Sequence, residues 1–309
     1  MTVREALVKA TVRLESRGVP NAGHDAAVLL GQVLGRPRLE LPLSYSRPLT
    51  EAEMTAFDAL IERRAGREPL QYILGTQVFM DFEVLVDRRV LIPRPETEVL
   101  AERAIALGRA ILAGRRAGGA GERMDGNGAG LTVADVGTGS GCLAIAIARA
   151  LAEARVTAID SSPGALEVAR LNVARLGLSG RVGLVLGDFL GPLILGGQVV
   201  DLVVSNPPYI PRADLAGLQE EVRDHEPRVA LDGGPDGLDA YRVLAVEAPR
   251  VLAPGGWVAL ELGFGQAAEV RAMFEAAGFR PVEISPDLAG ISRVMTARWA
   301  GPATSGERP

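Results

Sequence analysis

The stretch Val203–Pro211, VVSNPPYIP, runs from an apolar segment into an amide, two prolines and an aromatic ring. Proline has no backbone N–H and a fixed φ, so this stretch cannot continue as a paired strand and must turn. The side-chain oxygen of Asn206 and the carbonyl of Pro207 could each accept a hydrogen from a substrate NH2 group. Pro208 would stiffen the turn, and Tyr209 would offer a face to a planar group. An Asn-Pro turn can also simply close a strand, so the surrounding residues must decide.

A glycine-rich stretch, DVGTGSG at Asp135–Gly141, separates a strand pattern from a helix pattern. Glycines let the backbone approach a ligand closely and open a helix N-terminus toward it. The spacing is G-x-G-x-G rather than the dinucleotide fingerprint G-x-G-x-x-G, because position 142 is cysteine. By itself this motif could be only a tight turn. The residues predicted to contact a cofactor here are Gly137, Thr138, Gly139, Ser140 and Gly141.

Acidic residues follow the next two predicted strands, Asp160 in TAID and Asp188 in LGDF. A carboxylate at the first position can accept both hydroxyls of a ribose. Asp188 could accept from an adenine amino group beside Phe189. Either acid could be an ordinary strand-end residue, but three consecutive strand ends of this kind favour an adenosine site. The chain has no P-loop sequence and Lys9 is its only lysine, so S-adenosylmethionine, a cation without phosphates, fits better than NAD or ATP.

An alternation of strands and helices must position these residues. From about Leu131 onward, short apolar runs alternate with amphipathic stretches at a spacing typical of an α/β fold with a doubly wound, mostly parallel sheet. Residues 95–300 form this predicted main domain. The stretch 113–130, rich in glycine and arginine, is predicted to be a flexible surface loop, and 301–309 a disordered tail.

The first part of the chain has a different pattern. Residues 1–75 show helical periodicity, with capping boxes expected from Thr2 with Glu5 and from Thr50 with Glu53, and predict a small helical bundle. Residues 76–94 include QVFMDFEVLVD, whose period of two predicts a β-hairpin connector.

Composition narrows the class of protein. The 309 residues are 48% hydrophobic and 23% charged, which is typical of a soluble globular protein, and the net charge of −5 gives no broad basic face for nucleic acid. Cys142 is the only cysteine, and His24 and His225 are the only histidines, so we expect neither an internal disulfide nor a metal centre. Cys142 is expected to be a small core residue, and His225 a loop residue rather than a general base.

The N-terminal stretch MTVREALVKATVRLES carries charges throughout and has no signal-peptide core. No apolar run approaches the roughly 20 residues of a membrane span. We therefore expect a cytoplasmic protein without membrane partners.

Together, the Gly loop, the two acids and Asn206-Pro207-Pro208-Tyr209 resemble the class I S-adenosylmethionine-dependent methyltransferases that modify a planar NH2 nitrogen. DNA adenine methyltransferases and protein glutamine methyltransferases share that tetrapeptide. Three further segments resemble the bacterial peptide chain release factor glutamine methyltransferases, over nearly the whole chain. They are REPLQYILG (67–75), VLIPRPETEVL (90–100) and HEPRVALDGGPDGLDAYR (225–242).

The resemblance implies methylation of the glutamine in the Gly-Gly-Gln loop of class I release factors. It implies a Rossmann-like, seven-stranded methyltransferase sheet in 95–300 and a substrate-docking role for 1–75. Gly137 to Gly141, Asp160, Phe189 and Asn206 would contact the cofactor. Asn206, Pro207 and Tyr209 would act in catalysis, and Pro208 would help hold the glutamine amide. The resemblance also places Arg94 and Glu96 at the substrate mouth. A structural role for these residues, in the Pro-Arg-Pro turn that leads into the first helix of the catalytic domain, is an equal alternative. The family often has tryptophan at the position of Phe189, whose apolar face can still meet adenine.

Two other functions remain open from sequence. A DNA adenine amino-group methyltransferase would need a basic track for phosphates, but residues 1–95 contain thirteen basic and twelve acidic residues, a net charge of about +1. A non-catalytic, cofactor-binding partner of release factors would be expected to have lost Asn206 or Tyr209, and both are present. A monomer is the default expectation.

Overall fold

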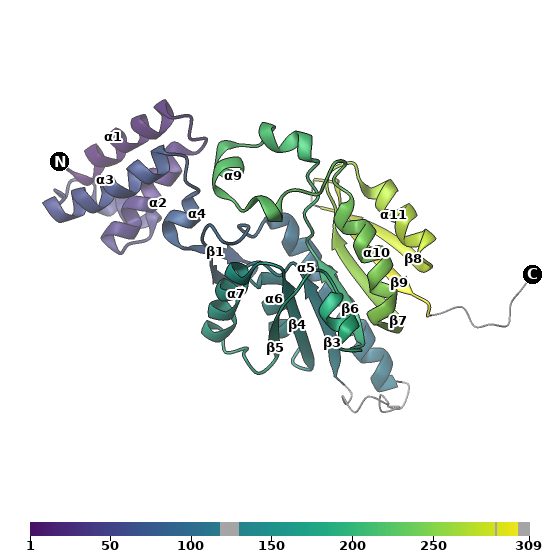
Figure 1. The fold of residues 1–309 in the computed structure, drawn as a ribbon. Helices are drawn as coiled ribbons and strands as arrows, with labels where there is room; N and C mark the ends of the chain where they lie inside the picture. Colours follow the sequence, from purple (N-terminus) through teal and green to yellow (C-terminus); the bar gives the residue numbers. More distant parts are fainter. Residues whose placement is uncertain (118–129, 288, 302–309) are drawn as a thin grey trace, which may run out of the picture. The chain divides into compact units, whose positions relative to one another are not determined.

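The computed structural model describes residues 1–117, 130–287 and 289–301, and these form two compact units (Figure 1). The first unit comprises Met1–Thr76 together with Leu218–Glu226, and the second comprises Gln77–Gly217 and the residues from Pro227 onward. The sequence-based division ends the first unit at residue 75 and assigns 218–226 to the main domain. The structure instead groups that later segment with the N-terminal helices.

The first unit is a helical bundle that packs around the apolar faces of its helices, with Leu14, Leu29, Leu30 and Phe57 fully buried. Both predicted capping boxes are confirmed: the Thr2 and Thr50 hydroxyls accept from the third helical N–H, and Glu5 and Glu53 reach back to the capping residue. The elements are α1 (Val3–Ser16), α2 (Ala22–Leu34), η1 (Arg38–Ser44), α3 (Glu51–Ala65), α4 (Leu70–Leu74) and α9 (Glu220–His225).

A buried ion network explains why α9 belongs to this unit. Arg64 on α3 donates to Asp25 on α2 at 2.8 Å and to Glu221 on α9 at 2.9 Å. Arg67 also donates to Glu221, at 2.9 and 2.5 Å. The side chains of Arg64 and Asp25 are only 6% and 7% exposed, so these charges depend on one another for compensation. His225 is the last residue of α9, so its assignment to a loop was wrong.

Two short strands follow the bundle, β1 (Thr76–Phe79) and β2 (Phe82–Leu85), and they form the predicted hairpin. Phe79 and Phe82 meet edge to face at 5.8 Å on either side of its turn. Asn172 fastens the end of β2 because its amide accepts from Leu85 N–H at 2.7 Å and donates to the Leu85 carbonyl at 3.0 Å.

The second unit contains a seven-stranded sheet with the order β5-β4-β3-β6-β7-β9-β8. Its strands are β3 (Leu131–Val136), β4 (Ala154–Asp160), β5 (Val182–Leu186), β6 (Val200–Ser205), β7 (Leu252–Glu261), β8 (Phe279–Pro286) and β9 (Ser292–Trp299). The first five run parallel, and β9 is antiparallel to both β7 and β8. The predicted doubly wound, mostly parallel sheet is therefore confirmed. The order reverses between β3 and β6, which is where open α/β sheets bind ligands.

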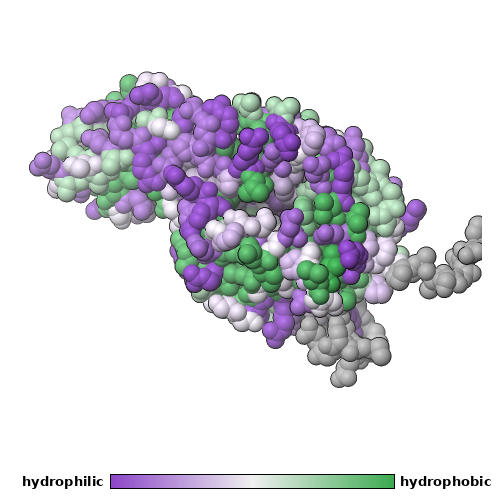
Figure 2. Space-filling view, in the orientation of Figure 1, coloured by the Kyte–Doolittle hydropathy of each residue, from purple (hydrophilic) through white to green (hydrophobic). Residues whose placement is uncertain are grey.

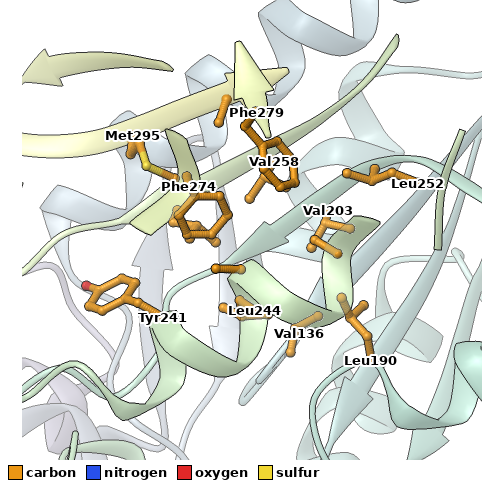
Figure 3. Packing of buried hydrophobic residues seen from close by; sticks show 14 of the residues in the cluster. Val136, Leu190, Val203, Tyr241, Leu244, Leu252, Val258, Phe274, Phe279 and Met295 are labelled. Atoms are coloured by element: carbon orange, nitrogen blue, oxygen red, sulfur yellow. The ribbon is translucent and has the colours of Figure 1, made fainter. Parts of the chain in front are cut away.

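Helices flank this sheet: α5 contacts α6, whereas α10 contacts α8 and α11 (Figure 1). Buried side chains such as Tyr241, Phe274, Phe279 and Val258 converge in the core under α10 and α11 (Figure 3). The helical elements are α5 (Pro95–Ala117), α6 (Cys142–Ala150), α7 (Pro163–Arg175), α8 (Gly191–Leu195), η2 (Arg212–Gly217), η3 (Arg228–Ala230), α10 (Asp239–Val251) and α11 (Ala267–Ala276).

Part of the predicted loop 113–130 is helical. Helix α5 continues through Ala117, and Arg115 on its last turns pairs with the buried carboxylate of Asp201 on β6. Residues 118–129, and the predicted tail from residue 302, lie outside the described residues. Polar and apolar residues are interspersed over the visible surface (Figure 2). Leu186 and Leu195 are among the exposed apolar side chains of the second unit. Over the described ranges, no helix is both long and apolar enough to cross a bilayer.

Candidate active site

The carboxyl ends of β3, β4, β5 and β6 lie at one edge of the sheet, because the register pairs Val136 with Ile159 and with Ser205, and Asp160 with Leu186. A cavity of about 290 Å³ opens at this edge, lined entirely by the second unit. The predicted site residues that line it are Gly137, Thr138, Gly139, Ser140, Asp160, Asp188, Phe189, Asn206, Pro207 and Pro208. Segments far apart in sequence thus meet in one hollow.

The Gly loop places bare backbone against this cavity. Gly137 and Gly139 have φ of +70° and +55°, and a Cβ added to either would meet nothing within 4 Å. Side chains there would project into the hollow and exclude a ligand. Gly141 does not line the cavity: its φ is +83° and an added Cβ would lie 3.3 Å from Ala169. Its role is to let α6 begin close to α7.

Asp160 is held at the end of β4 with its oxygens aimed in two directions. It accepts from Gly139 N–H at 2.8 Å and from Ser162 N–H at 2.9 Å. A carboxylate has about four acceptor positions, so further positions remain for ligand hydroxyls. Asp188 is exposed at the cavity wall, and Phe189 beside it adopts a left-handed φ of +45°. Non-glycine residues in that region concentrate at functional sites.

Asp135 is fully buried at the end of β3 and was given no role from sequence. Its Oδ2 accepts from the Thr138 hydroxyl at 2.6 Å and from Ala144 N–H at 3.1 Å, whereas its Oδ1 has no hydrogen-bond partner among the described residues. Burial raises the pKa of Asp135 to about 7, although those two hydrogen bonds oppose the rise. This oxygen lies beside the Gly loop, whose residues Gly137 to Ser140 line the cavity.

The electrostatic character of the cavity suits a cation. Among the residues that the structure describes, its wall carries the carboxylates of Asp160, Asp188 and Asp232 and the single guanidinium of Arg89. Arg89 is already paired with Asp87 at 2.6 Å and with Glu167 at 2.8 Å. The bare glycine backbone, the Asp160 acceptors and the apolar face of Phe189 fit an adenosyl sulfonium, which is a cation.

Asn206 follows β6 directly and is tied to two residues that sequence reasoning missed. Its Nδ2 donates to the Thr97 hydroxyl at 3.0 Å, and that hydroxyl donates to Glu261 Oε2 at 2.7 Å. The Tyr209 hydroxyl donates to Glu261 Oε1 at 3.2 Å, and the Tyr209 carbonyl accepts from Gln266 Nε2 at 2.9 Å. Tyr209 itself lies outside the cavity lining. The tetrapeptide is thus anchored at both ends.

Arg94 and Glu96 flank the cavity without lining it; Pro93 and Thr97 occupy the wall instead. The Arg94 carbonyl accepts from Thr97 N–H at 3.1 Å, which helps to start α5. Glu96 contributes negative charge that raises the pKa of Tyr209 and Glu261, in both cases less than burial does. Within the segment IPRPET, Thr97 makes the direct contact with Asn206.

Cys142 lies behind the Gly loop and is buried, as expected, although it also touches the cavity wall. Burial raises the pKa of its thiol to about 12. Over the described ranges, no group of three or more His, Cys, Asp or Glu side chains is arranged to hold a metal ion.

The Asp160→Ala variant is expected to bind the adenosyl cofactor more weakly by about 1–3 kcal/mol, so that Kd rises roughly 5- to 150-fold. The physical reason is the loss of charged acceptors for the ligand hydroxyls and of the support for Gly139 N–H. Isothermal titration calorimetry measures the change. Asp81→Ala, which removes an exposed carboxylate of the hairpin outside the cavity, is the control. An unchanged Kd for Asp160→Ala would remove this assignment.

The sheet order, with a cavity at its switch point, is that of a class I S-adenosylmethionine-dependent methyltransferase. Two family models match the chain, the PrmC N-terminal domain over residues 5–75 and a methyltransferase domain over residues 133–225. The release factor glutamine methyltransferase of Geobacter sulfurreducens is 45% identical over 297 residues, covering 96% of each chain. That of Moorella thermoacetica is 45% identical over 298 residues, covering 96% of this chain and 98% of its own. The chain belongs to the release factor glutamine methyltransferase family.

A solved structure is also similar. The release factor-specific protein-(glutamine-N5) methyltransferase of Alicyclobacillus acidocaldarius is 34% identical, with a TM-score of 0.40, and the match covers 68% of this chain and 95% of that one. The cofactor of this chain is S-adenosylmethionine, as the cavity wall and the methyltransferase domain indicate.

Proposed function

We propose that this protein transfers a methyl group from S-adenosylmethionine to the side-chain amide nitrogen of the glutamine in the Gly-Gly-Gln loop of a class I peptide chain release factor. One observation carries the proposal. Asn206 stands at the cavity edge with its Nδ2 committed to Thr97 at 3.0 Å, which leaves its Oδ1 as the end of the amide that can accept. An acceptor fixed in this way selects a substrate that donates N–H.

The chemistry follows from the weakness of an amide as a nucleophile. Its nitrogen lone pair is delocalised into the carbonyl, so the NH2 group must be held in line and its lone pair localised. Asn206 Oδ1 and the Pro207 carbonyl can each accept one of its two hydrogens. When bound, the cofactor supplies an electrophilic methyl group on a sulfonium. The nitrogen loses its proton after transfer, so no strong base is needed beforehand.

The remaining site residues support binding and orientation. Gly137 and Gly139 let the backbone meet the cofactor, and Asp160 accepts from its ribose. Asp188 and Phe189 meet the adenine. Pro208 stiffens the turn. The Tyr209 ring, which lies next to the cofactor cavity rather than in its lining, borders the glutamine amide, and its hydroxyl is anchored to Glu261. Arg94 and Glu96 shape the substrate mouth through the chain around Thr97.

The helical unit is proposed to dock the release factor protein, with residues 1–75 as the docking domain, 76–94 as the connector and 95–300 as the catalytic domain. We propose a cytoplasmic monomer that binds no nucleic acid directly. The family models support this division, because one matches residues 5–75 and the other begins in the second unit at residue 133.

Radiolabelled S-adenosylmethionine tests the proposal. The purified protein is incubated separately with a bacterial class I release factor, with its Gly-Gly-Gln to Gly-Gly-Ala variant and with double-stranded DNA. We expect label in the wild-type factor only. Label in DNA would assign the same site to an adenine amino group, and label in neither, with cofactor still bound, would favour a non-catalytic partner.

A further inference from the structure

We propose that Thr97 and Glu261 are positioning residues that determine which end of the Asn206 amide faces the substrate, and that Glu261 does so as a carboxylate. The inference rests on the proposed function, since it concerns how the same site recognises an NH2 group. It gives a role to two residues that lie far from Asn206 in the sequence, Thr97 at 109 positions and Glu261 at 55 positions.

Both residues are built into rigid elements. Thr97 is in the first turn of α5 and is 2% exposed, and Glu261 is the last residue of β7 and is 1% exposed. The Glu261 backbone is fixed as well, because its carbonyl accepts from the buried hydroxyl of Tyr241 at 2.9 Å. Side chains held on such elements place their partners more accurately than side chains on loops do.

The direction of the hydrogen bonds follows from the carboxylate. An ionised carboxyl can only accept, so the Thr97 hydroxyl must donate to Oε2 and the Tyr209 hydroxyl to Oε1. Thr97 has one proton, which is then used, and it can meet Asn206 only as an acceptor. Asn206 must therefore point its Nδ2 at Thr97, and its Oδ1 is presented in the orientation that accepts a substrate N–H.

Protonation of Glu261 would remove this constraint. A neutral carboxyl can donate to Thr97, whose hydroxyl could then donate to Asn206 Oδ1. In that arrangement the amide presents its NH2 end, which cannot accept from another NH2 group. We call Asn206 Oδ1 and the Pro207 carbonyl, the two acceptors for the substrate NH2 group, the amide clamp. The buried hydrogen bonds from Glu261 through Thr97 hold Asn206 in its accepting orientation only while Glu261 carries its charge.

The environment of Glu261 places its protonation in the neutral pH range. Burial raises its pKa to about 7, opposed by the hydrogen bonds from Thr97 and Tyr209; Glu96 adds to the rise and Arg293 opposes it. The native pKa thus lies above the ordinary value of 4.5. The stability that the protonated group contributes is therefore fully present below about 4.5 and is lost as the pH rises through about 7. The fold gives up stability to keep a charge that the proposed clamp uses.

Paired variants of Thr97 test the hydroxyl. Thr97→Val has nearly the same shape but cannot accept from Asn206, and we expect kcat on the release factor to fall about 10- to 100-fold. Thr97→Ser keeps the hydroxyl and should stay within about threefold of wild type. Thr296→Val, the same change at a buried residue of β9, is the matched control and should leave kcat unchanged. The Kd for S-adenosylmethionine is measured for each variant, and kcat is taken at saturating cofactor, so that an effect on binding is separated from an effect on transfer.

A pH profile tests the charge. The kcat of the wild type, at saturating cofactor and release factor, should fall as the pH drops below about 7, because the accepting orientation is lost. Glu261→Gln should be less active at pH 8 and should lose this acidic limb. Asp135 titrates near the same pH, so a limb that remains unchanged in Glu261→Gln would belong to Asp135 and would overturn the role of the Glu261 charge. A second readout is the melting temperature. The difference in Tm between Glu261→Gln and the wild type should shift in favour of the variant when the pH is raised from 5.5 to 8.

The outcomes separate the two proposals. Absence of label in the release factor with the wild-type protein would refute the proposed function. If the wild type labels the release factor normally, the proposed function stands. The positioning role would then be overturned if Thr97→Val were as active as the wild type, or if Thr97→Ser were as impaired as Thr97→Val.

Discussion

Replacing Asn206 by alanine is expected to lower kcat for release factor methylation by about a thousandfold while the fold is preserved. The size follows from preorganised hydrogen-bond groups at reacting atoms, where loss of one group typically lowers kcat by about 100- to 1000-fold. Here the lost acceptor would also leave the substrate amide free to rotate. The fold should survive because Asn206 stands in a half-buried turn after β6 rather than in the core.

The measurement is single-turnover transfer of labelled methyl groups, accompanied by circular dichroism and by the Kd for S-adenosylmethionine. The control is Asn21→Ala, an exposed residue whose side chain makes no cap to its helix, and it should change neither kcat nor Tm. Near-normal turnover by Asn206→Ala would show that the amide clamp is wrong.

The Arg64→Met variant should lower the free energy of unfolding of the helical unit by about 3–5 kcal/mol, because it leaves buried carboxylates without their partner. Asp25 is 7% exposed and is bound by Arg64 at 2.8 Å. Of its two arginine partners, Glu221 would keep Arg67. Burial opposes the charge of Glu221, but the bonds from Arg67, the backbone and Arg64 outweigh it and lower the pKa of Glu221 to about 2.

The neighbouring arginine provides a matched control. Arg63 on the same helix pairs with Glu68 at 2.7 Å but is 44% exposed, so Arg63→Met should reduce stability by about 1 kcal/mol or less. Amide hydrogen exchange of α1, α2 and α3 in the intact protein measures both changes. Equal effects of the two variants would contradict the argument that burial makes the Arg64 network strongly coupled.

Much of the architecture is predictable from short stretches. The capping boxes at Thr2 and Thr50 are local, because a side chain and a backbone N–H three residues apart meet in any helix that begins there. The alternation of strand and helix restricts topology to a parallel, right-handed winding. The edge of the sheet that carries the Gly loop, Asp160 and Asn206 follows from that winding, since parallel strands end on the same side.

Other features escaped prediction because they depend on charge pairs across long separations. The sequence predicts that helix α9 belongs to the catalytic domain. In the structure it belongs to the helical unit, where Glu221 is bound by Arg64 and Arg67, more than 150 positions earlier. The extension of α5 to Ala117 brings Arg115 against Asp201, 86 positions later in the sequence. A glycine- and arginine-rich composition favours a loop locally, and the pairing of Arg115 with a distant carboxylate is a contact that local composition does not signal.

The sequence by itself determined the type of chemistry: the Gly loop, the two acids and Asn206-Pro207-Pro208-Tyr209 are contiguous motifs whose residue types imply a cofactor and an NH2 acceptor. The tertiary structure decided how the clamp is held. Thr97 and Glu261 reach Asn206 from α5 and β7. Neither residue type signals such a role locally, because a threonine in a first helical turn is ordinary and a glutamate at a strand end is usually solvated. Burial at the meeting point of three elements turns them into a directed hydrogen-bond chain.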